Sequence, residues 1–250
     1  MSRGVRRALF LVSAAVFGVV LVAAFTGLPD FGHYRGPYGT ILDAVAVHQR
    51  HATDLVTAVN FDYRAIDTLC EEFILFAAVL GVAVVLRTVR GEHQRASDRP
   101  AEDHHFPGTS GALGAFGALM IGPTLTLGIY IVAHGALTPG GGFQGGVILA
   151  AALLIVFLAG EYLALKVIAP HASVEATEAM GAAGYGLVGL GGLLAGSAFF
   201  HNFMELGSPG QLLSAGTMPI SNASVGLEVG GAFLLLWTEF LDQALVVRGS

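Results

Sequence analysis

Several carboxylates of this sequence lie within or beside long apolar stretches, where an ionised group is costly unless it has a partner or water. Asp67 and Glu71 are four residues apart in "AIDTLCEEFILFAAVLGVAVVL", so on a helix they share one face and lie about one turn apart. Two carboxylates this close disfavour each other's ionisation, which suits groups that bind and release a proton. The same positions also fit an alternative in which both residues cap a helix N-terminus at the level of the lipid headgroups. The residues alone leave both interpretations open.

Four further ionisable residues are candidates for an ion or proton path. Glu72 lies about 100° around a helix from its acidic neighbour and needs a partner of its own. Glu161 lies inside an apolar stretch, where it either pairs with a neighbouring helix or reaches the membrane interface. Glu228 stands in "SVGLEVGG", whose glycines permit close helix contact, so that its carboxylate could bridge two helices. His134 ends an apolar stretch and serves there either as a structural hydrogen-bonding group or as a proton relay.

Two other patterns suggest chemistry that their context does not support. The histidines of "EDHH", residues 102–105, stand in a polar run with no ligand spacing, so we expect a solvated linker and no metal site. The single cysteine, Cys70, excludes an internal disulfide framework. The sequence also has no iron–sulfur spacing, so we expect no redox centre and no resident cofactor.

The stretch "HGALTPGGGFQGG", residues 134–146, matches the G-x-G-x-x-G spacing of dinucleotide-binding proteins. That fingerprint requires a preceding strand inside a βαβ unit, whereas an apolar stretch long enough to span a membrane precedes it here. We therefore predict a tight reversal between two helices, in which Pro139 ends the approach and the glycines permit positive φ and close contact. Phe143 is expected to pack into the bundle, and Gln144 to satisfy backbone groups near the membrane.

The composition indicates the solvent in which these residues act. Apolar residues make up 54% of the chain and charged residues 12%, and the mean hydropathy is +0.70. A soluble domain carries about twice that charged fraction, so the lipid bilayer is the expected solvent. The 35 glycines suit close packing of membrane helices. The net charge of −6 disfavours nucleic acid as a partner.

The hydropathy pattern predicts an all-α, polytopic membrane protein. A spanning helix needs roughly 20 mainly apolar residues, and the first such stretch is too long for a signal peptide, so we expect it to be retained. Glu239 and Asp242 close the last stretch and are expected at the interface. Six stretches qualify as spans, at residues 8–26, 65–86, 113–134, 145–165, 179–200 and 225–247.

The distribution of basic residues predicts the orientation. With six spans, nine of the 12 arginines and lysines fall on the side of the termini, which places both the N- and C-termini in the cytoplasm. We divide the chain into a two-span unit at residues 1–90, a cytoplasmic linker at 91–110 and a four-span unit at 111–250. Residues 38–59 are expected to form either a helix in the outer interface or a packed extramembrane helix.

The four-span unit resembles the MnhB domain, the core of the MnhB-type subunits of the Mrp multisubunit sodium/proton antiporters. The match covers about residues 111–248. It rests on the P-G-G-G-F-Q-G-G string from Pro139 to Gly146 and the S-A-G-T-x-P string from Ser214 to Pro219. The motif residues are Pro139, Gly140, Gly141, Gly142, Phe143, Gln144, Gly145, Gly146, Gly216 and Pro219.

The two-span unit is similar to the C-terminal helices of the largest Mrp subunit and to a small two-helix subunit of membrane-bound hydrogenases. The family pattern is roughly V-N-x-I-x-V-D-F-R-x-x-D-T-x-G-E. This chain departs from it at Tyr63, at Cys70 and by being shorter before Asp62, and the second acidic residue, Glu72, is unusual. The matching positions are Val59, Asn60, Asp62, Arg64, Asp67, Thr68 and Glu71.

The resemblance implies a transporter subunit with no catalytic residue, in the cytoplasmic membrane of a prokaryote. Its partners would be lipid and other Mrp-type subunits, including antiporter-like large subunits that carry the main proton paths. Sodium ions and protons would be the transported species. Asp67 and Glu71 match acidic positions of the family and rank first as ion-path candidates, with Glu228 second. The alternatives are a membrane-arm subunit of a hydrogenase-type or related redox-driven complex, and a purely structural scaffold.

Overall fold

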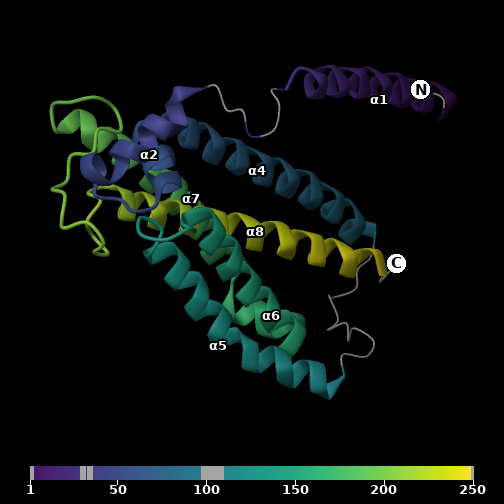
Figure 1. The fold of residues 1–250 in the computed structure, drawn as a ribbon. Helices are drawn as coiled ribbons and strands as arrows, with labels where there is room; N and C mark the ends of the chain where they lie inside the picture. The colour runs from purple at the N-terminus through teal and green to yellow at the C-terminus, as the bar shows by residue number, and fades with distance from the viewer. Residues whose placement is uncertain (1–2, 29–31, 33–35, 97–109, 249–250) are drawn as a thin grey trace. The chain divides into compact units, whose positions relative to one another are not determined.

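The computed structural model describes the backbone of residues 3–28, 32, 36–96 and 110–248. Within those ranges, the side chains of residues 3, 6, 87–96, 160–163 and 242–248 are not described. All regular secondary structure of the described residues is helical, which confirms the predicted all-α class. The helices are α1 (Arg3–Thr26), α2 (Pro37–Arg50), α3 (Leu55–Ala58), the π-helix η1 (Val59–Tyr63), α4 (Ala65–Ala96), α5 (Gly111–Ala133), α6 (Gly142–Ile168), α7 (His171–Leu194) and α8 (Met218–Arg248) (Figure 1).

The chain divides into two compact units, Met1–Ile41 and Leu42–Ser250. In the first unit, α1 is apolar around its whole circumference, and none of its spanning window is buried. Phe10, Phe17 and Val19 are each more than half exposed. A helix that is hydrophobic on every side requires lipid or another protein chain around it.

Among the described residues, five helices are long and apolar enough to cross a membrane. They confirm a polytopic membrane protein, and they coincide with five of the six predicted spans. Their apolar segments are Arg7–Thr26, Ala65–Leu86, Gly111–Ala133, Gly142–Ala159 and Met218–Leu241.

The remaining predicted span, at residues 179–200, corresponds to α7, but the bounds of the helix differ from the predicted ones. It begins at His171 and therefore includes Glu175 and Glu178, which lower the hydropathy of its first turns. It ends at Leu194 because Gly196 adopts φ +77° and its N–H bonds to Leu193 O, which closes the last turn. The predicted boundaries were wrong at both ends, since hydropathy alone marked only the apolar middle of the helix.

Glycines bring α8 into backbone contact with two other helices. A Cβ on Gly181 of α7 would collide with the backbone N of Glu228, and one on Gly231 of α8 would lie 2.7 Å from the backbone N of Glu178. A Cβ on Gly146 of α6 would lie 2.8 Å from Gly226 O. Small residues permit this close approach in membrane helix pairs. Helix α4 packs along the same α8, as Figure 1 shows.

The glycine-rich stretch forms the predicted reversal between α5 and α6. Gly140 and Gly141 have φ values of +149° and +123°, which a side chain would strain. Asn222 of α8 holds the start of α6, since its Oδ1 accepts a hydrogen bond from Gly142 N at 2.8 Å. Phe143 is half-exposed and makes an edge contact with Phe233, so it packs into the bundle less than expected. Gln144 is exposed, and its expected role toward backbone groups stays a prediction.

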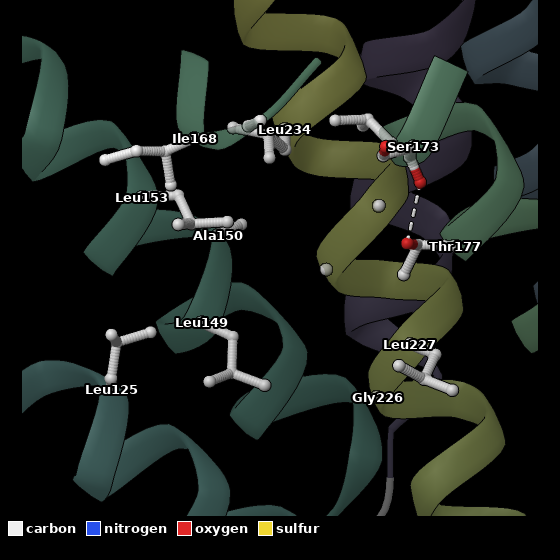
Figure 2. A pocket seen from close by; sticks show the side chains of 14 residues that line it. Leu125, Leu149, Ala150, Leu153, Ile168, Ser173, Thr177, Gly226, Leu227 and Leu234 are labelled. Atoms are coloured by element: carbon white, nitrogen blue, oxygen red, sulfur yellow. Dashed lines mark hydrogen bonds between the residues drawn. The ribbon is translucent and has the colours of Figure 1, made fainter. Parts of the chain in front are cut away.

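An apolar pocket of about 280 Å³ lies among α5, α6, α7 and α8 (Figure 2). Its walls carry leucines from α5, α6 and α8, and Thr177 bonds to Ser173 O at 2.8 Å along one side. No carboxylate lines this pocket. It is therefore a packing gap separate from the acidic residues described below.

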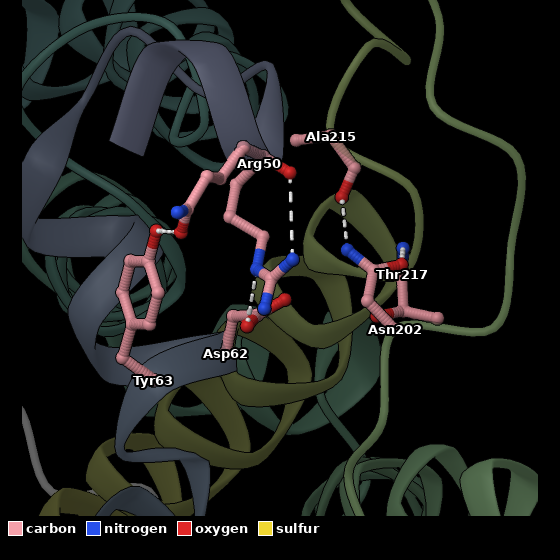
Figure 3. Close-up of polar contacts among 7 residues, drawn as sticks. Arg50, Asp62, Tyr63, Asn202, Ala215 and Thr217 are labelled. Atoms are coloured by element: carbon pink, nitrogen blue, oxygen red, sulfur yellow. Dashed lines mark hydrogen bonds and ion pairs between the residues drawn. The ribbon is translucent and has the colours of Figure 1, made fainter. Parts of the chain in front are cut away.

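Loops at one end of the second unit are joined by polar contacts (Figure 3). Arg50 at the end of α2 donates from Nε to Asp62 Oδ1 at 2.6 Å and lies over the ring of Tyr63. Asn202 accepts a hydrogen bond from Thr217 N and donates one to Ala215 O, which fixes the loop before α8. These contacts hold the segment before α4 and the segment before α8 in place.

Candidate ion-path site

Three helices place glutamates in the interior of the second unit. Glu72 of α4, Glu178 of α7 and Glu228 of α8 have exposed fractions of 4%, 1% and 0%. No arginine or lysine of the described residues pairs with them. Buried carboxylates in membrane proteins face a partner or a wet cavity and mark ion or proton paths.

The carboxyl groups of Glu72 and Glu228 lie close enough to interact with each other across α4 and α8. Neither oxygen of Glu228 accepts a hydrogen bond from an N–H or O–H group of the described chain. A hydrogen bond between two carboxyl groups requires a proton on one of them. The pair is therefore a candidate site for a proton shared between α4 and α8.

Helix periodicity explains why Glu72 points inward. Ala65, Thr68 and Val79 are also buried, and they precede or follow Glu72 by four or seven residues on the same face. Tyr185 of α7 anchors the start of this face, because its hydroxyl donates to Ala65 O at 3.0 Å. The register of α4 against α7 and α8 is thereby fixed.

Glu178 lies beside the pair because α7 and α8 are antiparallel and touch through glycine. Gly181 rests on the backbone of Glu228, and Gly231 rests on the backbone of Glu178. The two glutamates are close enough for their charges to interact, and Glu178 Oε1 has no hydrogen-bond partner among the described residues. Glu178 therefore extends the acidic interior along α7.

A second set of ionisable groups joins the N-terminal end of α7 to the C-terminal part of α8. His171, the first residue of α7, lies with Nε2 2.8 Å from Glu239 Oε1 of α8. Its Nδ1 lies 3.4 Å from Glu175 Oε2, one turn along α7. Glu239 is 1% exposed within the chain, and its expected place at the membrane interface stays a prediction.

The two leading candidates from the sequence lie on the outer surface of α4. Asp67 is half-exposed and forms an ion pair with Arg64 at the first turn of the helix, and Glu71 is exposed. Helix geometry turns Glu71 and Glu72 about 100° apart, so the first faces away from the chain and the second faces into it. The interior position thus belongs to the residue that departs from the family pattern.

The remaining candidates have separate surroundings. His134 caps α5, stacked on Tyr130 with ring centroids 4.0 Å apart and Nδ1 3.1 Å from Tyr130 O. Glu161 lies in α6, and its side chain is outside the described residues, as is that of Asp242. Within the described part of the chain, no three His, Cys, Asp or Glu side chains converge as a metal site would require.

Sequence reasoning missed Glu178 because the fifth span was drawn from residue 179. A signal was present, since Val174, Gly181 and Tyr185 share a helix face with Glu178 and all are buried. A glutamate on a face of glycine, valine and tyrosine indicates an interior position. Its neighbour along the helix, His171, lay in the segment assigned to a loop.

Helices of spanning length around buried carboxyl groups define a multi-pass membrane protein. Residues 112–235 match the family described as a domain related to the MnhB subunit of Na+/H+ antiporters. The chain belongs to this family, and the predicted resemblance to Mrp-type subunits is confirmed.

Similar proteins match most of the chain. An uncharacterized protein of Methanocaldococcus jannaschii is 34% identical over 193 residues, which cover 70% of this chain and 71% of that protein. A chain of the membrane-bound sulfane sulfur reductase, an archaeal respiratory membrane complex, is 30% identical, with a TM-score of 0.71 over 95% of this chain and 98% of that one. A chain of the Mrp complex from Dietzia sp. DQ12-45-1b is 25% identical, with a TM-score of 0.69 over 96% of this chain and 26% of that one.

Proposed function

We propose that this chain is a membrane subunit of an Mrp-type sodium/proton antiporter complex and supplies part of its proton path. The observation that carries the proposal is the buried pair Glu72 and Glu228, whose carboxyl groups face each other without a basic partner among the described residues. In this proposal the chain has no catalytic residue and no resident cofactor. Protons and sodium ions are the cargo of the complex.

The exposed face of α4 supports the proposal that this chain lies beside a larger subunit of the complex. Glu71 lies there next to Ile74, and Ile66 and Phe73 are also exposed. A carboxylate among apolar side chains is costly against lipid, so this face suits contact with a protein that offers a polar partner. We assign that position to an antiporter-like subunit, with Glu71 and Asp67 as the ion-path candidates at the contact and Glu72 as the entry into this chain.

The proposed orientation places both termini in the cytoplasm of a prokaryotic cell, because most arginines lie on their side of the spans. Under this orientation, the polar loop contacts of Arg50 and Asp62 face outward. His171 and Glu239 then lie toward the cytoplasm.

A redox-driven complex is the second candidate. The 30% identity to a chain of the sulfane sulfur reductase complex, matched over 98% of that chain, favours it. The two candidates differ in their partners. Purification of the native complex and identification of its co-purifying chains separates them, since redox subunits accompany this chain only in the second case.

The functional test replaces Glu228 by glutamine in the assembled complex. We expect the loss of sodium-dependent proton flux in inverted membrane vesicles with unchanged assembly, because glutamine keeps the shape and loses the exchangeable proton. Glu205→Gln, in an exposed loop, is the matched control and should leave the flux unchanged. Full flux in both Glu228→Gln and Glu72→Gln would support the scaffold alternative instead.

A further inference from the structure

The ionisable side chains of α7 form a row that leads away from the buried glutamate pair. His171, Glu175 and Glu178 are spaced by four and three residues, so they share one face of the helix. Seven residues of helix separate the first from the last, a rise of about 10 Å. The facing stretch of α8 contains Glu228 and Glu239, which are eleven residues or about 16 Å apart along the axis. That distance is about half of the hydrocarbon thickness of a bilayer.

We propose that the proton path continues from Glu228 through Glu178 and Glu175 to His171, which exchanges protons with water at the far end of α7 and α8. This inference rests on the proposed function, since it extends the same path. It adds three residues of the path and the group at which protons enter or leave. None of these three residues belongs to the two sequence strings on which the resemblance to MnhB rests, Pro139–Gly146 and Ser214–Pro219.

Burial along the row fits a path from the interior to the surface, with two buried residues at one end and two partly exposed side chains at the other. Glu228 and Glu178 are fully buried. Both carboxylate oxygens of Glu228 and Oε1 of Glu178 have no hydrogen-bond partner among the described residues. The side chains of Glu175 and His171 are 41% and 37% exposed, so both lie at the surface end of the row. The glutamates beyond Glu175 are closed to the surface.

The contacts of His171 suit proton exchange. Its two ring nitrogens face different carboxylates, Glu239 Oε1 at 2.8 Å and Glu175 Oε2 at 3.4 Å. An imidazole can bind a proton at one nitrogen and release one from the other. Glu239 on α8 holds the ring in place, while Glu175 lies on the side of Glu178 and interacts with it electrostatically.

Each transfer is a balanced proton exchange. A hydronium ion gives a proton to the imidazole and leaves as water, and Nδ1 gives a proton to the Glu175 carboxylate, which restores the neutral imidazole. The O–H bond of Glu175 then breaks as one forms at Glu178, and the same exchange passes the proton to Glu228 and Glu72. The proposed steps move protons only and transfer no electrons.

The test replaces His171 by glutamine in the assembled complex. Glutamine can still donate a hydrogen bond to Glu239 but cannot relay a proton. We expect the flux, measured as uptake of radioactive sodium by inverted vesicles, to fall about tenfold or more. Glu178→Gln should give a similar loss. His201→Gln, in an exposed loop outside the row, is the matched control and should keep full uptake.

Chemical rescue separates a relay from a structural role. In His171→Ala, added imidazole should restore much of the sodium uptake, because the site is open to water and the shortened side chain leaves room. Wild-type uptake at the same imidazole concentration corrects for collapse of the pH gradient. Glu178→Gln should show no rescue, since its site is buried.

The outcomes distinguish the two proposals. Full uptake in His171→Gln and Glu178→Gln, together with loss in Glu228→Gln, would overturn this extension and leave the proposed function standing. Full uptake in all three would overturn both. If His171→Gln fails to assemble, Glu178→Gln and the imidazole response of His171→Ala decide. Loss in His171→Ala without rescue by imidazole would assign the residue a structural role and overturn the relay.

Discussion

Substitution of Gly181 by alanine should separate α7 from α8 and thereby disturb the acidic interior. The added Cβ would collide with the backbone N of Glu228 and lie 2.6 Å from its Cα and from Ser224 O. Backbone atoms cannot rotate away as a side chain can, so the helices must move apart. Overpacking of this kind costs about 1–3 kcal/mol, and alanine returns up to about 1 kcal/mol through its lower chain entropy in the unfolded state. We expect a net loss of roughly 1–2 kcal/mol.

Gly186→Ala provides a matched control in the same helix. No atom lies within 4 Å of a Cβ at Gly186, so alanine should stabilise α7 by about 0.4–1 kcal/mol. The assay heats the purified complex in detergent and measures thermal unfolding as the fraction that remains assembled. Sodium uptake should also fall in Gly181→Ala, because the displaced helices move Glu178 away from Glu228. Equal or higher stability of Gly181→Ala relative to wild type would refute the packing argument.

Three further substitutions test separate parts of the structure. Asn222→Ala should destabilise the complex by about 1–3 kcal/mol in thermal unfolding, because the buried Gly142 N–H loses its acceptor, and wild-type stability would contradict this role. Tyr185→Phe should cost about 0.5–1.5 kcal/mol in the same assay while sodium uptake persists, since the hydrogen bond to Ala65 O is lost. Loss of uptake in a stable complex would place the hydroxyl in the path. Asp67→Asn should change stability by less than about 1 kcal/mol, because its ion pair with Arg64 is exposed. It should reduce sodium uptake if the α4 face contacts an antiporter-like subunit. Unchanged uptake would remove Asp67 from the path.

The sequence predicted most of the fold because hydropathy and helix periodicity determine it. Five predicted spans coincide with spanning helices, and the reversal at residues 134–146 contains the positive φ values that its glycines indicated. The start of α7 was not predictable from hydropathy, since His171, Glu175 and Glu178 look like a polar loop in a window average. The burial of Glu178 depends on the packing of α8 against it.

The candidate site was harder to predict than the fold. Glu71 and Glu72 are adjacent, and helix geometry requires that they face different directions, but the sequence does not say which direction is inward. The inward direction is set by tertiary contacts, namely Tyr185 against Ala65 and the packing of α4 along α8. Glu228 was identified as a helix-bridging residue from its glycine neighbours, and the structure places it opposite Glu72. Its role in ion transport stays a prediction.

Sodium-dependent proton flux in vesicles that contain the complex with Glu228→Gln tests the central claim most directly. The buried pair with Glu72 predicts loss of flux in a complex that assembles at the wild-type level, while Glu205→Gln retains full flux. Wild-type flux in an assembled Glu228→Gln complex would contradict the claim that this carboxyl group carries protons.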